Sequence, residues 1–262
     1  MNTTGDSTQE CVCFSFPNQS SCERIELHEN KLKMGTPIKF YYDFLSQPSR
    51  ALYIFLKLTK IPFEENPIAL RKGVHMTDEF RDKVNRFKKV PAIVDNGFQL
   101  SESVAIFRYL ASRNKIDDQW YPKNDQVRAR IDEYLEWQHY HTRQTCAQYF
   151  ILSYMKPRTV GPSAGDAQIV ASAETQMTQT LDMIENLWLR PGCFISGTNQ
   201  LSFADILAAC EIEQPTITGY DPTENRPNLG EWIKLVKELT NPVYDEAHEI
   251  LYRLREQERA KL

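Results

Sequence analysis

The amino-acid sequence predicts an α/β half followed by an all-helical half, and three observations carry that prediction. A period-2 pattern at residues 38–44 changes abruptly into helical spacing, strand signals follow at 61–70 and 88–100, and no convincing strand follows residue 123. The 262 residues are enough for two modest domains, and a hydrophobic content of 41% is enough for a buried core. We expect the order β-α-β-α-β-β-α in the first half.

The first strand and the helix after it meet at Ser46. Apolar side chains alternate with polar ones from Ile38 to Phe44, which is typical of a strand with one buried face. Ser46 can then cap a helix, and Pro48 fits the first turn, where its missing N–H is not needed. Backbone N–H groups and the positive end of the helix dipole would stabilise an anion beside the serine hydroxyl. The alternative is that Ser46 is only an N-cap.

The next elements complete the α/β half. Residues 61–70 indicate a second strand, parallel to the first because the helix between them is long enough for a crossover. Residues 71–75 indicate a loop, and Thr77 begins a short helix. Residues 88–100 indicate a hairpin with an Asn-Gly turn. Pro91 stands at a strand start, where a cis peptide bond is one way to fit it.

The helical half contains several apolar faces at helical spacing. We expect a long helix from Ile131, a turn or loop over 156–165, a capping sequence at Ser202–Asp205, and a last helix around 247–254. The predicted parts are a disordered extension (1–35), an α/β domain (36–114), a linker (115–122) and an all-helical domain (123–262).

Composition limits the classes of partner. Basic residues number 31 and acidic residues 35, with no basic stripe among aromatics, so we expect no nucleic-acid binding. No apolar run reaches the roughly 18 residues that cross a bilayer, so we expect no membrane span. The six cysteines follow neither a disulfide framework nor zinc spacing, which indicates a reducing compartment and no metal site.

The motifs SQPSR after the first strand, KKVPA at the third strand and SESVAI at the third helix occur in this order. With Asp132–His139 and Glu246–Glu249, they make residues 36–255 similar to the cytosolic glutathione transferases, and the closest class is theta, in an insect-like form. The resemblance implies a thioredoxin-like domain that holds glutathione and a helical domain that supplies the pocket for a small hydrophobic electrophile. It also implies detoxification by conjugation to alkyl or aryl halides, or reduction of organic hydroperoxides.

The resemblance implies roles for particular residues. Ser46 would be the catalytic residue, donating a hydrogen bond to the glutathione sulfur, so that the nucleophile belongs to the co-substrate. Arg143 would face the electrophile pocket, and the alternative is a solvated arginine. The glutathione-binding residues implied are Gln47, His75, Lys89, Val90, Pro91, Glu102 and Ser103.

Within that set, the backbone of Val90 would pair with the cysteinyl part, with a cis Pro91 turning it toward the ligand. Glu102 would meet the γ-glutamyl ammonium, and Ser103 its carboxylate. His75 and Lys89 would hold the glycine carboxylate. A solvated histidine, a surface lysine and a plain helix start are the alternatives.

Two departures from the family pattern affect these expectations. Asn85-Arg86 stands where relatives commonly have Asn-Pro, in the loop before Lys89. The chain ends soon after Glu246–Glu249, so we expect a pocket without the C-terminal segment that covers it in vertebrate theta enzymes. The resemblance also implies a homodimer in the cytosol, although Ala260-Lys261-Leu262 resembles a peroxisomal address.

Two other functions compete with catalysis by conjugation. A non-catalytic relative would keep the fold as a ligand carrier or scaffold. A thiol-disulfide oxidoreductase would need a cysteine at the first helix, where this chain has Ser46 and no Cys-x-x-Cys, so we reject it.

Overall fold

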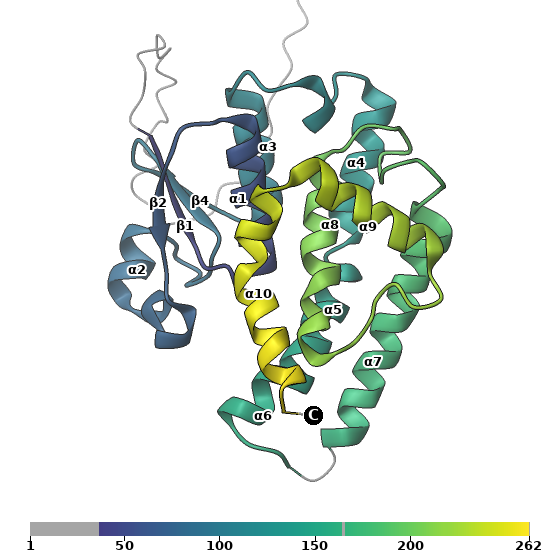
Figure 1. Ribbon diagram of the computed structural model, residues 1–262. Coiled ribbons are helices and arrows are strands. Elements are labelled where there is room, and N and C mark those ends of the chain that lie inside the picture. Colours follow the sequence, from purple (N-terminus) through teal and green to yellow (C-terminus); the bar gives the residue numbers. More distant parts are fainter. Residues whose placement is uncertain (1–36, 164–165, 262) are drawn as a thin grey trace, which may run out of the picture. The chain divides into compact units, whose positions relative to one another are not determined.

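The structure, a computed structural model, describes residues 37–163 and 166–261, and the predicted extension 1–35 lies outside them. Its first part has the predicted order of β1 (Ile38–Tyr42), α1 (Gln47–Thr59), β2 (Phe63–Pro67), α2 (Asp78–Lys83), β3 (Ala92–Asp95), β4 (Phe98–Ser101) and α3 (Ser103–Arg113). Its second part contains α4 (Asp125–Trp137), α5 (Thr142–Phe150), α6 (Lys156–Thr159), α7 (Asp166–Met183), α8 (Phe203–Glu213), α9 (Pro227–Thr240) and α10 (Val243–Arg259) (Figure 1).

Short helical turns connect these elements. The 3₁₀ turns are η1 (Leu70–Lys72), η2 (Val74–Met76), η3 (Asp118–Trp120) and η6 (Gln214–Thr218), and the π-helical turns are η4 (Ile151–Met155) and η5 (Ile184–Trp188). None of the described helices is long and apolar enough to cross a membrane.

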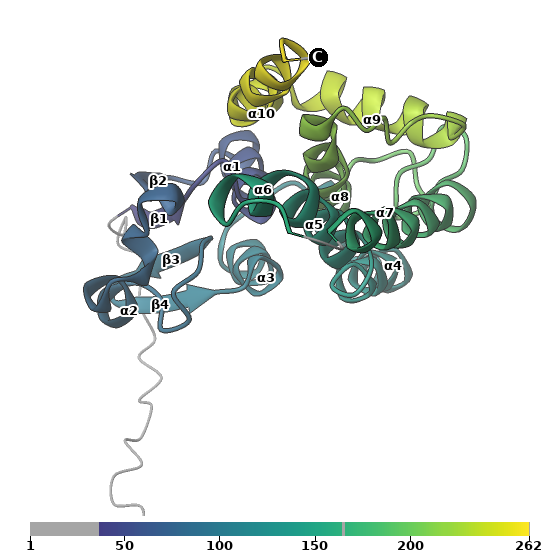
Figure 2. The ribbon, with the colours of Figure 1, turned by 90° about the horizontal axis from the view of Figure 1, so that it is seen from below.

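The four-stranded mixed sheet has the order β2-β1-β3-β4. β1 runs parallel to β2, as predicted, and antiparallel to β3, which pairs antiparallel with β4. Helices α1 and α3 cover one face of the sheet and α2 lies on the other (Figure 2). Phe40 is fully buried in the core with α1, whereas the ring of Tyr41 meets Phe80 of α2 at 6.3 Å. Successive side chains of β1 therefore pack into two separate hydrophobic clusters, one on each face of the sheet.

Three phenylalanines join the α/β part to the helical part. Phe55 of α1, Phe107 of α3 and Phe203 of α8 have no exposed surface. Phe107 and Phe203 are stacked with ring centroids 4.2 Å apart, and Phe55 meets both edge-on at 5.3 and 5.5 Å. Each buried ring contributes about 1.5–3 kcal/mol. One core therefore continues from the sheet layer into the helices.

The buried guanidinium of Arg50 makes a second connection. Its Nη1 donates to the carbonyl of Phe44 at 2.7 Å, and its Nη2 donates to the carbonyl of Cys210 and to Oε1 of Gln214 at 2.8 and 2.7 Å. The loop before α1 is thereby tied to α8 and η6.

Three details of the helical part differ from the predictions. The predicted loop over 156–165 begins as helix, because Pro157 lies in the first turn of α6, where proline is tolerated. The predicted long helix ends at Trp137 and restarts at Thr142. In the predicted linker, Trp120 is 4% exposed and packs on Phe55, so this segment is part of the core. The domain boundaries 36–114, 115–122 and 123–262 stay a prediction.

Candidate functional site

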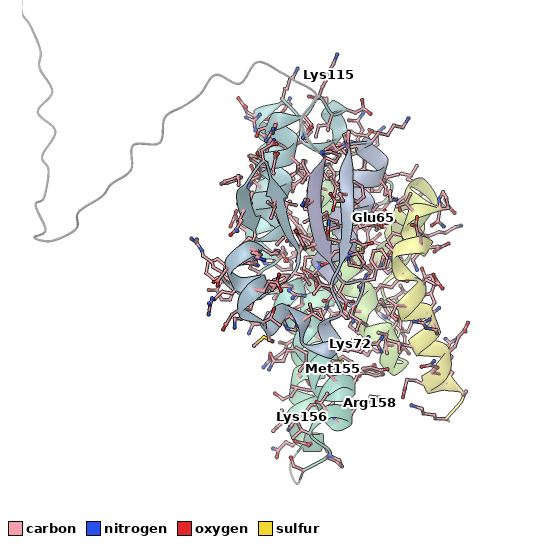
Figure 3. The ribbon with its side chains drawn as sticks, turned by 90° about the vertical axis from the view of Figure 1, so that its left-hand side faces the viewer. Glu65, Lys72, Lys115, Met155, Lys156 and Arg158 are labelled. Atoms are coloured by element: carbon pink, nitrogen blue, oxygen red, sulfur yellow. The ribbon has the colours of Figure 1, made fainter. Side chains whose placement is uncertain are left out.

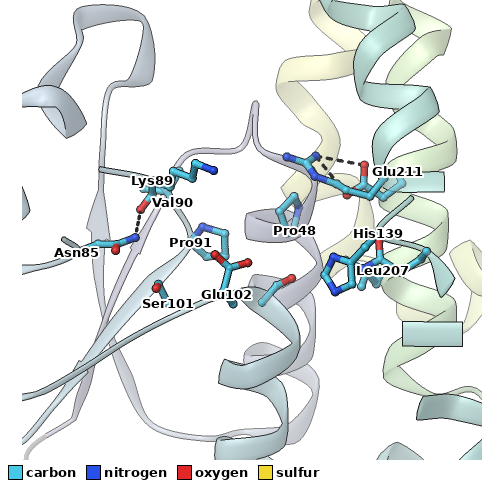
Figure 4. A pocket seen from close by; sticks show the side chains of 13 residues that line it. Pro48, Asn85, Lys89, Val90, Pro91, Ser101, Glu102, His139, Leu207 and Glu211 are labelled. Atoms are coloured by element: carbon cyan, nitrogen blue, oxygen red, sulfur yellow. Dashed lines mark hydrogen bonds and ion pairs between the residues drawn. The ribbon is translucent and has the colours of Figure 1, made fainter. Parts of the chain in front are cut away.

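Two adjoining cavities bring all nine predicted site residues together. The larger, of about 460 Å³, is lined by Ser46, Gln47 and His75, and the smaller, of about 140 Å³, by Pro91, Glu102 and Ser103. The remaining three predicted residues, Lys89, Val90 and Arg143, line both cavities. Figure 4 shows the smaller cavity, with the labelled Asn85, Lys89 and Ser101 on one side and His139, Leu207 and Glu211 on the other.

Ser46 lies at the end of a tightly held loop. The carboxylate of Asp43 accepts hydrogen bonds from the backbone N–H groups of Leu45 and Leu70 at 2.8 and 2.9 Å. The N–H of Ser46 donates to the carbonyl of Asp43 at 2.9 Å, and Arg50 holds the carbonyl of Phe44. These bonds fix the position of Ser46 between β1 and α1.

The interpretation of Ser46 as a plain side-chain cap is wrong. Ser46 occupies the N-cap position with extended backbone angles, but its hydroxyl makes no capping hydrogen bond. Pro48 stands at the second helical position and has no N–H, which removes one of the two backbone donors that an N-cap side chain can accept from. The residue is 8% exposed and lines the larger cavity, so its hydroxyl is available there as a donor.

A short loop presents Lys89, Val90 and Pro91 to the cavities. The Val90–Pro91 peptide bond is cis, as the sequence suggested. Asn85 is 3% exposed and organises the loop, because its Nδ2 donates to the carbonyl of Lys89 at 2.7 Å and its Oδ1 accepts from the N–H of Phe87 at 3.0 Å. The side chain of Asn85 therefore shapes this loop without the proline that relatives carry.

Glu102 and Ser103 begin α3 at the smaller cavity. Glu102 has φ 70° and ψ 115°, a strained conformation for a residue with a side chain, at a cost of about 1–3 kcal/mol. Its carboxylate does not cap the helix and points into the cavity (Figure 4). Ser103 is the first residue of α3, so the free N–H groups of that helix end open toward the same space.

His75 and Lys89 line the larger cavity with the basic side chains of Arg71, Lys88 and Arg143. Nδ1 of His75 is buried and has no hydrogen-bond partner among the described residues. Lys88 is already engaged by the carbonyl of Met76 at 2.7 Å and by Asp78 at 3.3 Å. The rim of this cavity is therefore cationic.

Part of the lining of the larger cavity is apolar. It consists of Leu45, Leu70, Ala147, Phe150, Ile151 and Met155. Ile151 and Met155 begin and end the π-helical turn η4, and Met155 lies beside the loop that carries Lys72 (Figure 3). The lining of the cavity thus combines apolar side chains with charged groups.

Arg143 lies on α5, beyond the helix break, and not on the long helix that the sequence predicted. Its Nη1 donates to Oε1 of Gln47 at 2.9 Å and lies 3.3 Å from both carboxylate oxygens of Glu211. Burial raises the pKa of Glu211, and the positive charges of Arg143 and Arg50 oppose that rise. The side chain of Gln47, the residue after Ser46, is thereby bonded to the ion pair of Arg143 and Glu211.

Sequence reasoning missed Asn85, Gln138 and Glu211 as residues of these cavities. Glu211 and Gln138 are at most 2% exposed, and each occurs in a stretch that reads as ordinary helix. The one available signal for Glu211 was a charge inside the nearly continuous apolar run of α8. Within residues 37–163 and 166–261, no group of three or more His, Cys, Asp or Glu side chains is arranged to hold a metal ion.

The sequence and the fold match known proteins over most of the chain. Residues 39–112 match the family model "Glutathione S-transferase, N-terminal domain", and residues 142–239 match "Glutathione S-transferase, C-terminal domain". Rat glutathione S-transferase theta-1 is 39% identical over 220 residues, which cover 84% of this chain and 90% of the rat protein.

Solved structures of theta enzymes agree with these matches. Apo human glutathione S-transferase T1-1 has a TM-score of 0.78 at 38% identity, covering 84% of this chain and 91% of the human one. A human theta-class enzyme in complex with the glutathione conjugate of 1-menaphthyl sulfate has a TM-score of 0.79 at 35% identity, covering 86% and 91%. The chain belongs to the glutathione S-transferase family, within its theta class, and is therefore a transferase with glutathione as its co-substrate.

Proposed function

We propose that this protein detoxifies small hydrophobic electrophiles by conjugating them to glutathione, with Ser46 as the catalytic residue. The observation that carries the proposal is the uncapped hydroxyl of Ser46, which lines the larger cavity between a cationic rim and an apolar wall. The hydroxyl donates a hydrogen bond to the glutathione sulfur and favours its thiolate form. Lowering a thiol pKa by about two units needs roughly 2.7 kcal/mol, within reach of one charge-assisted hydrogen bond and a helix N-terminus.

The remaining predicted residues hold the tripeptide in an extended conformation. The backbone of Val90, turned by the cis bond to Pro91, pairs with the cysteinyl residue. His75 and Lys89 meet the glycine carboxylate at the rim of the larger cavity. The positive charges of the rim support this orientation of glutathione, because they attract the glycine carboxylate.

The γ-glutamyl end of glutathione enters the smaller cavity. Its carboxylate lies at Ser103 and the N-terminus of α3, and its ammonium lies at Glu102. Gln47, tied to Arg143 at 2.9 Å, lines the larger cavity between this end and the thiol position.

The electrophile occupies the apolar part of the larger cavity, with Arg143 at its polar edge. With an alkyl or aryl halide, the thiolate attacks the carbon, a C–S bond forms, the carbon–halogen bond breaks and halide leaves. With an organic hydroperoxide, two glutathione molecules are oxidised to the disulfide while the hydroperoxide is reduced to an alcohol and water. In both cases the apolar side chains of η4 that line the cavity would contact a compact hydrophobic substrate.

The test compares the wild-type protein with Ser46→Ala. The variant should stay folded, because no capping bond is lost, while the pKa of bound glutathione rises and turnover of a halide panel falls about ten- to hundred-fold. Near-UV difference spectra across a pH series measure the thiolate. An unchanged thiol pKa in the variant would refute the role of Ser46, and glutathione binding without turnover of any halide or hydroperoxide would indicate a carrier instead.

We also propose a homodimer that acts in the cytosol, on the strength of family membership. Static light scattering at micromolar concentration should return twice the chain mass, and a monomer mass would refute the dimer. No comparison supports the peroxisomal reading of Ala260-Lys261-Leu262, and Leu262 lies outside the described residues.

A further inference from the structure

The turn η4 supplies part of the apolar lining of the larger cavity. It runs from Ile151 to Met155 between α5 and α6, and both of these end residues line the cavity. π-helical turns are rare and occur mostly as single turns, frequently at functional sites. The contacts that hold η4 in place therefore affect the shape of this cavity.

One of these contacts comes from Arg158 of α6. Its Nη1 donates to the carbonyl of Tyr154 in η4 at 2.8 Å, and its Cζ lies 3.8 Å from the centroid of the Tyr154 ring. The face of an aromatic ring attracts a guanidinium in this position. The Tyr154 ring is in turn stacked on Phe150, with centroids 5.3 Å apart, and Phe150 lines the larger cavity. Arg158 therefore reaches the cavity lining through one buried tyrosine.

The end of α10 binds the same guanidinium. Nη2 of Arg158 donates to Oε2 of Glu258, and the end of α10 accordingly lies beside α6 (Figure 1). The Glu258 side chain is 20% exposed, so the ion pair is partly shielded from solvent. A buried hydrophobic cluster joins α10 to η4, and its members are Phe150, Tyr154, Ile217, Leu251 and Leu254. A side chain 100 positions away in the sequence therefore holds the residue that supports η4.

Arg158 and Glu258 lie outside the lining of both cavities. We propose that they are positioning residues, which hold η4 through Tyr154 and thereby limit the size of the aryl group that the larger cavity accepts. The inference rests on the proposed function, because it places the electrophile in that cavity. The residues proposed to bind glutathione belong to the α/β part of the chain, so this ion pair should act on electrophile selection alone.

The test uses two electrophiles with the same reacting group, benzyl chloride and 1-(chloromethyl)naphthalene. In both, the thiolate attacks the methylene carbon, the C–S bond forms and chloride leaves, so the substrates differ in the size of the ring system. Arg158→Leu removes both hydrogen bonds and the charge. We expect the ratio of kcat/KM for the naphthyl substrate to that for the benzyl substrate to rise about three- to tenfold, because η4 can then move away from the larger ring and holds the smaller one less closely.

Further variants test whether the two residues act as a pair. Glu258→Met should also raise the ratio, and adding it to Arg158→Leu should raise the ratio no further, because both changes remove one interaction. Arg158→Lys keeps a cation for the tyrosine ring and for Glu258, so its ratio should lie closer to that of the wild type than to that of Arg158→Leu. Glu256→Met, at an exposed glutamate on the same helix, is the matched control and should leave the ratio unchanged.

Two measurements separate this role from a general loss of structure. The KM for glutathione should stay at the wild-type value in every variant. The Tm should change little, because a partly exposed ion pair contributes little to stability.

The contrary outcomes are distinct. An unchanged ratio in Arg158→Leu, the same ratio in Glu256→Met as in Glu258→Met, independent effects in the double variant, or a raised KM for glutathione would overturn the inference and leave the proposed function standing. If Arg158→Leu does not fold, Glu258→Met carries the same test, and an unchanged ratio there would overturn the inference. A wild-type protein that conjugates neither chloride would overturn the proposed conjugation of halides, on which the inference rests.

Discussion

At the scale of one residue, Glu211 shows how burial changes the pKa of a carboxyl group that lines the smaller cavity. Its side chain is 1% exposed, and its carboxylate faces Arg143, which is 38% exposed and also holds Gln47. Burial raises the pKa of Glu211, with Arg143 and then Arg50 opposing. A carboxyl group whose pKa is raised by folding favours its protonated form in the native state, so its stabilising contribution is lost as pH rises through the native pKa.

We predict a pH-dependent effect of Glu211→Gln. The wild type loses stability as pH rises above the usual pKa of a glutamate, because its carboxyl group then ionises more readily in the unfolded state. The glutamine of the variant cannot ionise, so the variant does not lose this stability. The free energy of unfolding of the variant, relative to the wild type, should therefore increase from pH 4 toward neutrality, as measured by urea denaturation at each pH. A difference that is flat or falls with pH would contradict the raised pKa.

The loop 85–91 shows how one buried side chain shapes a whole element. Asn85 bonds to the carbonyl of Lys89 and the N–H of Phe87, and the loop places Lys89 and Val90 at both cavities and the cis Pro91 at the smaller one. Arg86 follows this asparagine, where the family resemblance led us to expect proline. The contacts of Asn85 hold the loop in this chain without that proline.

We predict that Asn85→Ala weakens glutathione recognition more than it slows chemistry. Two backbone groups lose their partner, at a cost of about 1–3 kcal/mol in stability, and the looser loop raises the KM for glutathione while kcat stays near the wild-type value. Steady-state kinetics with varied glutathione measure this split. Asn66→Ala on β2, which loses a bond to the carbonyl of Glu64 away from the cavities, should leave KM unchanged. A fall in kcat alone would contradict the assignment.

At the scale of the whole molecule, α1 connects the sheet to the helices. Its apolar residues pack with Phe107 and Phe203, and its buried Arg50 reaches the carbonyls of Phe44 and Cys210. The loop that carries Ser46 is therefore tied directly to α8, which also carries Glu211. The position of Ser46 therefore depends on contacts made by both parts of the chain.

We predict that Arg50→Lys destabilises the protein and lowers activity together. An ammonium group cannot reach all three acceptors that the planar guanidinium serves, so at least one buried acceptor is left unpaired, at about 1–3 kcal/mol each. Thermal unfolding should show a lower Tm, and turnover should fall because the loop before Ser46 loses its anchor. Arg253→Lys, an exposed position on α10, serves as the control and should change neither quantity. A stable and fully active Arg50→Lys would show that the loop is held by Asp43 alone.

The sequence by itself determined the order of strands and helices in the first half, the hairpin, and the helix starts at Thr77 and Ser202, and it offered a cis bond as one way to fit Pro91. These features depend on side-chain alternation, turn residues and caps within a few positions of one another, so a local pattern specifies them. The nine predicted site residues came from the family resemblance and not from such local patterns, and the structure gathers all nine around two cavities.

Only the tertiary structure decided which other groups meet these residues. Arg143 contacts Gln47 across 96 positions in the sequence and Glu211 across 68. No local period encodes such pairings, because they depend on how α5 and α8 pack against α1. A buried glutamate or glutamine therefore reads in sequence as one more helical position, and its role follows from the partners that folding brings to it.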